Sequence, residues 1–78
     1  MRIALVTRKG CHLCEEALAT LRGLGVEPFL LDVDADPELS RLYDFRVPVL
    51  LVEGRVVAEG RLDAPALRRA LRRRAGTA

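Results

Sequence analysis

The sequence predicts an α/β fold with the element order β-α-β-α-β-β-α, in which a four-stranded mixed sheet has helices on both faces. Two observations support this prediction. Short runs rich in valine and leucine alternate with segments whose apolar residues recur every three or four positions. Turn and capping residues stand between these segments, where strands and helices would end. We expect the 78 residues to form one small domain, residues 1–78.

The first half of the chain predicts a right-handed β-α-β unit with parallel strands. Residues 2–7 form an apolar run that is expected to be a buried strand. A helix should follow Gly10 and end near Gly25, which suits a left-handed C-terminal cap. The second strand should open at Pro28 and end at Asp32 or Val33. The expected apolar face of the helix is formed by Leu13, Cys14, Ala17, Leu18, Leu21 and Leu24.

The next segments predict a short helix and a hairpin. Asp36 suits the N-cap of the helix, and Pro37 suits its first position. Strands are expected at residues 47–52 and 55–59, joined by a two-residue turn at residues 53–54. Because the predicted strands are uniformly apolar, helices should cover both faces of the sheet. The apolar face of the short helix should hold Leu39, Leu42 and Tyr43.

A final helix is expected after Asp63, which suits its N-cap. Leu62 and Leu67 stand at the two positions of a hydrophobic staple, and residues 76–78 are expected to fray. The helix is rich in arginine, and we expect these side chains to form a solvated face rather than a docking surface. They are Arg68, Arg69, Arg72, Arg73 and Arg74.

Composition argues against several classes of protein. Half of the residues are apolar and 31% are charged, as in globular proteins and unlike disordered chains. No apolar run approaches the roughly 20 residues of a membrane span, and the first residues lack a signal-peptide cleavage site, so we expect a cytoplasmic protein without a membrane partner. The net charge of +2 argues against nucleic acid as a partner. Phe29, Tyr43 and Phe45 are expected in the core, where they could not stack on bases.

The two cysteines, Cys11 and Cys14, stand at the expected start of the first helix. Unpaired amides and the helix dipole stabilise a thiolate there, so the pKa of Cys11 should be lowered. Cys14 lies about one turn later, within the Cα separation that a disulfide requires and in the apolar stripe. An exposed nucleophile beside a shielded resolving thiol is the arrangement that thiol-disulfide exchange needs.

Other uses of these cysteines have weaker support. Structural zinc usually takes four ligands, so the two thiols would need a second chain, and we expect no metal site within one. A disulfide between residues three apart closes too small a loop to stabilise the fold much. Two unreactive core thiols are the simplest alternative, because free cysteine is often buried. His12, between the cysteines, could lower the pKa of Cys11 or could be an exposed spacer.

Three segments match a known family: "RKGCHLC" at the cysteines, "VPVLLV" at the third strand and "EGRLDAPAL" before the last helix. With these segments the chain resembles a glutaredoxin of the thioredoxin-fold superfamily along nearly its whole length. It is similar in particular to small bacterial glutaredoxin-like proteins. The resemblance implies a thioredoxin-like fold, with Cys11 as the nucleophile and Cys14 as the resolving thiol.

The resemblance also implies a substrate site. Val47-Pro48 should be a cis peptide beside the nucleophile, where the backbone of Val47 could pair with an extended substrate. Arg8 should bind a carboxylate of glutathione. Gly60 and Asp63 should lie around the other end of that tripeptide, where amides at a helix start could bind a carboxylate.

The chain departs from the glutaredoxin pattern at several positions. The motif Cys-His-Leu-Cys lacks the usual Pro and Tyr, and Arg46 replaces the usual Thr before Val-Pro. Glu59 replaces the first Gly of a Gly-Gly pair, and its charge would repel an anionic tripeptide unless Arg61 offsets it. The fold and the thiol pair therefore transfer from the family better than glutathione specificity does.

These observations lead to two functional hypotheses. The first is a monomeric thiol-disulfide oxidoreductase with no bound cofactor, which reduces a disulfide-containing protein or a glutathione mixed disulfide. Glutathione or a reductase would restore its dithiol. The alternative is a binding module that docks a partner, or shares a metal or iron–sulfur cluster across a dimer.

Overall fold

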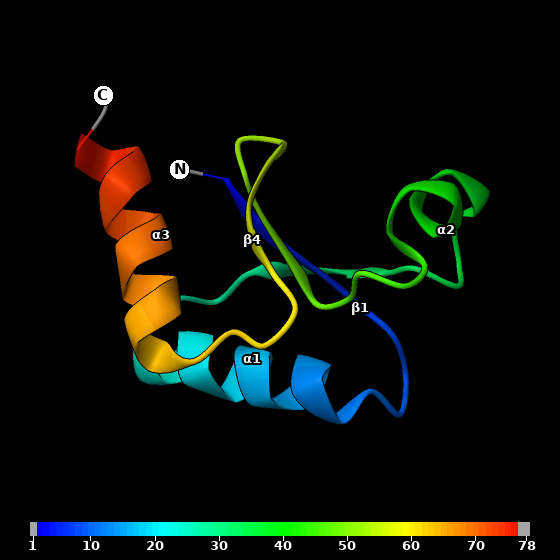
Figure 1. Ribbon diagram of the computed structural model, residues 1–78, viewed down its shortest axis with the longest axis horizontal. Helices are drawn as coiled ribbons and strands as arrows, with labels where there is room; N and C mark the ends of the chain where they lie inside the picture. The colour runs from blue at the N-terminus through cyan, green and yellow to red at the C-terminus, as the bar shows by residue number, and fades with distance from the viewer. Residues whose placement is uncertain (1, 77–78) are drawn as a thin grey trace.

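Four strands form one mixed sheet, and the chain has the predicted order β-α-β-α-β-β-α (Figure 1). The computed structural model describes the backbone of residues 2–76 and the side chains of residues 2–72. The strands are β1 (Ile3–Thr7), β2 (Phe29–Asp32), β3 (Val49–Val52) and β4 (Arg55–Glu59), and the helices are α1 (His12–Gly23), α2 (Pro37–Tyr43) and α3 (Ala64–Gly76). The spatial order is β2-β1-β3-β4, with β1 parallel to β2 and the other pairs antiparallel.

Alternate residues of the central strands face the two sides of the sheet, and each side has its own core. Leu5 and Leu50 pack against Leu21 of α1 and Leu67 of α3. On the opposite side, the buried side chains of Val6, Val33, Val49 and Leu51 pack against Leu39 and Tyr43 of α2. The helices therefore lie on both faces, as predicted, with α2 apart from α1 and α3 (Figure 1).

The predicted caps and turns are confirmed. The carboxylate of Asp36 accepts a hydrogen bond from the Glu38 amide at 2.8 Å, and Asp63 caps α3 by accepting one from the Ala66 amide at 2.9 Å. The hairpin turn uses Glu53 and Gly54, whose φ angles of 53° and 78° are the left-handed pair that a two-residue hairpin favours.

The ends of the chain are described only in part. Gly76, expected to fray, is the last residue of α3. Thr77 and Ala78 lie outside the described residues, and so do the side chains of Arg73 and Arg74. Arg68, Arg69 and Arg72 are exposed, as expected for a solvated face. No described helix is long and apolar enough to cross a membrane.

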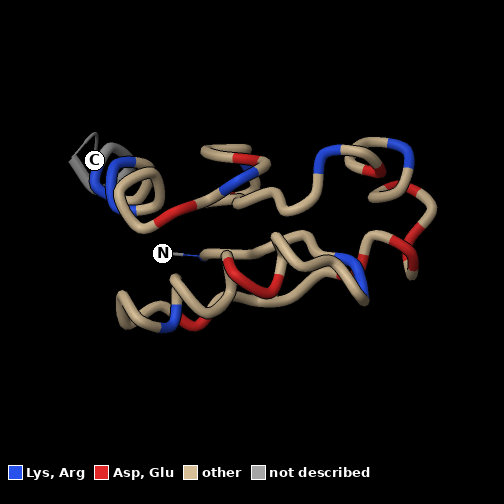
Figure 2. The backbone as a smooth tube through the Cα atoms, turned by 60° about the horizontal axis from the view of Figure 1, so that its bottom comes forward, with Lys and Arg blue, Asp and Glu red and all other residues tan. Residues whose placement is uncertain are grey.

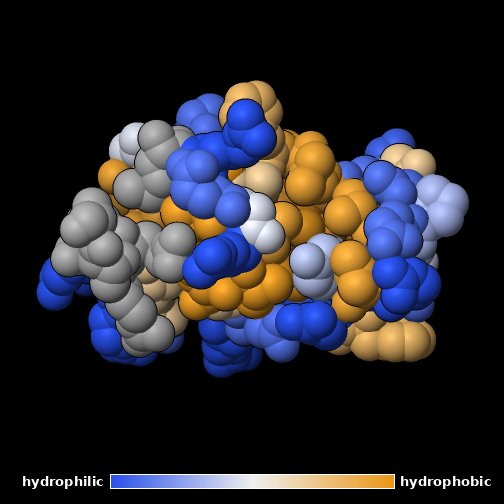
Figure 3. All heavy atoms as spheres, turned by 90° about the horizontal axis from the view of Figure 1, so that it is seen from above, coloured by the Kyte–Doolittle hydropathy of each residue, from blue (hydrophilic) through white to orange (hydrophobic). Residues whose placement is uncertain are grey.

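The structure corrects the expected core in two respects. Phe29 and Phe45 are 69% and 95% exposed, so they are not core residues, and Leu42 of α2 also reaches solvent. For Phe29 the reason is that α2 has only seven residues and covers part of its face of the sheet. A hollow of about 350 Å³ lined by Arg2, Ala4, Phe29 and Leu31 is left open, and Figure 3 shows hydrophobic side chains across the middle of one face.

The third strand begins at Val49 rather than at Val47 as predicted. Val49, opposite Val6, is the first residue that pairs with β1, and Pro48 before it has no backbone N–H to donate to a neighbouring strand. The strand still pairs with β1 over its full length, from Val49 opposite Val6 to Val52 opposite Ile3.

Burial predicts how two matched leucine substitutions should affect stability. Leu67 is fully buried between α3 and the sheet, so Leu67→Ala should lower the free energy of unfolding by about 2–5 kcal/mol. Leu30 is half exposed, so Leu30→Ala should cost under about 1 kcal/mol. Urea denaturation with an unchanged m-value measures both. Equal losses for the two variants would contradict the packing described here.

Candidate redox site

The two cysteines are joined at the start of α1, and they form a disulfide with their Cα atoms 5.2 Å apart. Cys11 is the N-cap of the helix, and its Sγ accepts a hydrogen bond from the Cys14 amide at 3.2 Å. Cys14 is 2% exposed, whereas Cys11 is only partly buried. A thiolate on Cys11 would occupy a position where an amide and the positive end of the helix dipole stabilise it.

A tight turn delivers Cys11 from the end of β1 to this position. The Cys11 amide donates to the carbonyl of Arg8 at 3.2 Å. Gly10 closes the turn with a φ of +76°, in the left-handed region that other residues rarely adopt. The glycine before the first cysteine is therefore required by the backbone.

Arg8 lies at the centre of an ion-pair cluster. Its Nε and Nη2 donate to the two carboxylate oxygens of Asp34, both at 2.9 Å. Nη2 also donates to the carboxylate of Asp44, and Nη1 donates to the Asp44 carbonyl at 3.0 Å. Four of the five guanidinium N–H groups are thus engaged within the protein. The predicted role of Arg8 in binding a substrate carboxylate stays a prediction.

The Val47-Pro48 peptide is cis, which confirms the expectation from the family resemblance. The pairing of Val6 with Val49 places it at the end of the sheet where β1 leads to Cys11. The Gly60 amide donates to the carbonyl of Pro48 at 2.9 Å, so the structure brings two of the predicted substrate-binding positions together. Their binding of a substrate, and that of Val47 and Asp63, stays a prediction.

Two of the departures from the glutaredoxin pattern form an ion pair with each other. The Nε and Nη2 of Arg46 donate to Oε2 of Glu59 at 2.9 and 2.5 Å. The guanidinium also lies over the ring of Tyr43, 5.2 Å from its centroid. The cation that contacts Glu59 is Arg46, and an offset of the Glu59 charge by Arg61 stays a prediction. Arg46 and Glu59 carry opposite charges and both depart from the glutaredoxin pattern, and this coincidence could have predicted the pair.

His12 points along the outside of α1. Its ring is 85% exposed, and its Nε2 lies 3.1 Å from Oε2 of Glu16, one turn further along the helix. Any effect of His12 on the pKa of Cys11 stays a prediction.

The carboxylate of Asp63, another predicted substrate-binding position, accepts a hydrogen bond from the Ala66 amide and so caps α3.

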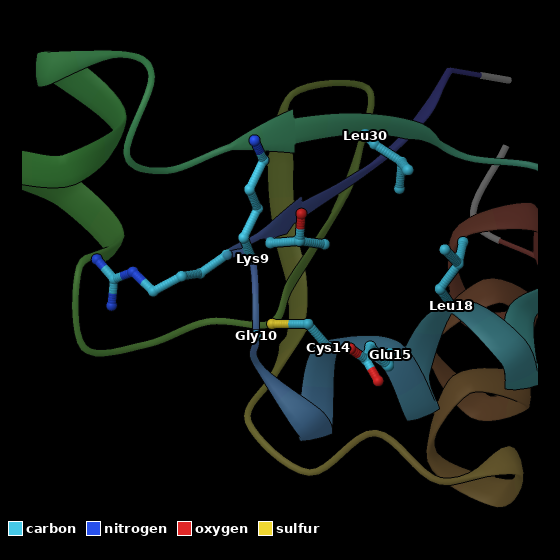
Figure 4. Close-up of a pocket in the computed structure, with 8 residues that line it drawn as sticks. Lys9, Gly10, Cys14, Glu15, Leu18 and Leu30 are labelled. Atoms are coloured by element: carbon cyan, nitrogen blue, oxygen red, sulfur yellow. The ribbon is translucent and has the colours of Figure 1, made fainter.

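A hollow of about 280 Å³ lies beside Cys14. In Figure 4 Glu15 lies beside Cys14, the side chain of Lys9 extends away from the cysteine, and Leu18 and Leu30 lie at the apolar end of the hollow. Within the part of the chain that the structure describes, no three His, Cys, Asp or Glu side chains gather to hold a metal ion.

The model of the family described as "Glutaredoxin-like domain (DUF836)" matches residues 2–72. This chain belongs to the glutaredoxin-like family. Among curated proteins, none matches it.

Solved structures agree with this assignment. The X-ray structure of target protein XcR50 from X. campestris is 36% identical, with a TM-score of 0.81 over 91% of this chain and 96% of that one. The solution structure of Ne2328 from Nitrosomonas europaea is 35% identical, with a TM-score of 0.75 over 87% of each chain. Thioredoxin 1 from Thermosipho africanus is 15% identical, with a TM-score of 0.65 over 99% of this chain and 97% of that one, which shows the shared thioredoxin-like fold.

The Arg8–Asp34 pair predicts a pH dependence of stability. Hydrogen bonds from Arg8 lower the pKa of Asp34 in the folded protein. The pair therefore stabilises the fold above the ordinary carboxyl pKa of about 4, and this stabilisation is lost as the pH falls through the lower folded-state value. The destabilisation caused by Asp34→Asn should be largest near about pH 6 and should disappear near about pH 2.

Urea denaturation across this pH range measures the effect, and a double-mutant cycle provides its control. In an Arg8→Gln background the carboxylate has lost its partner, so Asp34→Asn should no longer show this dependence. A destabilisation that is constant with pH in the wild-type background would contradict the assignment to this pair.

Proposed function

We propose that this glutaredoxin-like protein is a thiol-disulfide oxidoreductase, with Cys11 as the nucleophile and Cys14 as the resolving thiol. The observation that carries the proposal is the position of the Cys11 sulfur. It caps α1, accepts a hydrogen bond from the Cys14 amide and is bonded to the sulfur of Cys14, which the core shields. The asymmetry in burial gives each cysteine a separate role, because only the exposed thiolate can meet an incoming disulfide.

The reaction proceeds in two exchange steps. The Cys11 thiolate attacks one sulfur of a substrate disulfide, forming a mixed disulfide, and the other substrate sulfur leaves as a thiolate that takes up a proton. The Cys14 thiol loses its proton and attacks Sγ of Cys11, which releases the second substrate thiol. Two electrons pass from the cysteine pair to the substrate, and the protein is left with the Cys11–Cys14 disulfide seen here.

Two glutathione molecules or a dithiol reductase would supply the two electrons that restore the dithiol. No bound cofactor is needed in this scheme, because the sulfurs carry the electrons. We propose that the protein acts as a monomer, because a single chain holds both cysteines and the cis peptide. We also propose that it acts in the cytoplasm, where thiols are kept reduced.

Serine substitutions of the two cysteines should have different effects. Cys11→Ser should abolish reduction of a model peptide disulfide, because no nucleophile remains at the helix start. Cys14→Ser should keep the first step and accumulate a mixed disulfide, which mass spectrometry detects as the added mass of one peptide. Reduction that survives Cys11→Ser would refute the assignment. Stoichiometric metal in anaerobically purified protein, without reduction, would favour the binding-module alternative.

The reactivity of Cys11 should also reveal the influence of the helix. In Cys14→Ser the alkylation rate of Cys11 with iodoacetamide should titrate with a pKa below the roughly 8.5 of a free thiol. In Cys11→Ser the buried Cys14 should react slowly at every pH, which makes this variant the control. A Cys11 pKa at or above that of a free thiol would show that the capping position does not activate it.

A further inference from the structure

The segment between α2 and β3 holds an aromatic side chain in solvent at the redox end of the sheet. Phe45 is 95% exposed, and Leu42, three residues before it, is 41% exposed. The intervening Asp44 has helical backbone angles of −49° and −46°, and residues three apart on such a turn share one side. We refer to these two side chains as the Leu42/Phe45 patch.

Ion pairs hold this segment on both sides of Phe45. The preceding Asp44 accepts hydrogen bonds from Arg8, and the following Arg46 donates to Glu59. The residues on both sides of Phe45 are held by these pairs, and the ring lies outside the core. Burial would have been favourable for an aromatic side chain of this size. The ring is therefore attached to a backbone that ion pairs hold on both sides.

The patch lies close in sequence to the predicted substrate backbone. Phe45 lies two residues before Val47, whose cis peptide stands at the same end of the sheet as Cys11. An extended substrate that pairs with Val47 advances about 3.3 Å per residue, so its residues next to the reacting cysteine would lie within reach of the ring.

The charges at this end disfavour an anionic substrate. Arg8 has four of its N–H groups engaged by Asp34 and Asp44, and the guanidinium of Arg46 is engaged by Glu59. An incoming carboxylate would therefore find the guanidinium groups of Arg8 and Arg46 already engaged by carboxylates. Asp34, Asp44 and Glu59 supply the carboxylates of these pairs. Glu15 lines the hollow beside Cys14, together with Arg8 and Lys9.

Resting on the proposed function, we infer that the substrates are peptide or protein disulfides whose cysteine is flanked by an apolar residue and by neutral or basic residues. The Leu42/Phe45 patch contacts the apolar neighbour. Glu59 determines charge selectivity, because it withholds Arg46 from an acidic substrate. Glutathione, which is anionic and has no large apolar side chain, is disfavoured as a substrate.

The test compares symmetric disulfides of four short peptides that carry leucine or serine beside the cysteine, and lysine or glutamate at the next position. Glutathione disulfide is the fifth substrate. Reduced protein, freed of reductant, is mixed with each substrate without oxygen at low ionic strength. Each turnover passes two electrons from Cys11 and Cys14 to the substrate, which takes up two protons, and the thiols released are measured over time.

Wild-type protein should reduce the leucine–lysine peptide about tenfold faster than the leucine–glutamate peptide or glutathione disulfide. It should prefer leucine to serine about fivefold, and Phe45→Ala should remove that preference. Phe29→Ala, which truncates the other exposed phenylalanine, should retain it.

The charge preference has its own pair of variants. Glu59→Gln releases Arg46 and should reduce the lysine-over-glutamate preference about threefold or more. Glu27→Gln makes the same change in net charge and releases Arg22, which it contacts at 3.0 Å, but at the opposite end of the sheet. It should leave the preference unchanged.

The outcomes separate the inference from the proposed function. Cys11-dependent reduction at equal rates for all substrates would overturn the inference alone. So would a result in which each variant and its control change the substrate preference equally. A faster reaction with glutathione disulfide than with every peptide would also overturn it. Absence of any Cys11-dependent reduction would overturn the proposed function and the inference with it.

Discussion

The guanidinium of Arg8 lies between Asp34 and Asp44 and so joins three loops at one end of the sheet. Exposed ion pairs of this kind contribute only about 0–1 kcal/mol each, so their main effect here is on position rather than on stability. The effect matters because α2 has no fully buried residue of its own. Its few apolar contacts leave its placement dependent on the loops at its two ends. Residues 44–46 and the cis peptide at Val47-Pro48 follow α2 in the chain, so their placement depends on that of α2.

Most of the fold could be predicted because its signals are local. The caps at Asp36 and Asp63 and the turn at residues 53–54 each involve residues within a few positions of one another. The exposure of Phe29 and Phe45 could not be predicted in this way. Apolar periodicity identifies a buried face only in a longer element, and it does not show how far a seven-residue helix covers a sheet. The cis bond came from family resemblance alone.

The site could be predicted in its sulfur chemistry but not in its electrostatics. The spacing of Cys11 and Cys14 and their place at a helix start follow from the sequence. The partners of Arg8 lie 26 and 36 positions away, and sequence pattern gives no means of pairing charges over such separations. Across the whole chain the charges divide unevenly: α3 carries arginines and no acidic residue, whereas the acidic residues lie in the rest of the chain (Figure 2). The net charge of +2 therefore does not describe the charge around any one element.

The close spacing of the two cysteines has a consequence for how the protein changes with its oxidation state. Their Cα atoms lie 5.2 Å apart on one helical turn, within the ordinary range for bonded cysteines. The bond can therefore open or close by side-chain rotation while the helix keeps its course. A change of oxidation state is then expected to move the two sulfurs and to leave the outline of the surface nearly unchanged. A partner that binds only one of the two oxidation states would have to contact the sulfur atoms themselves, since the surrounding surface would have nearly the same shape in both.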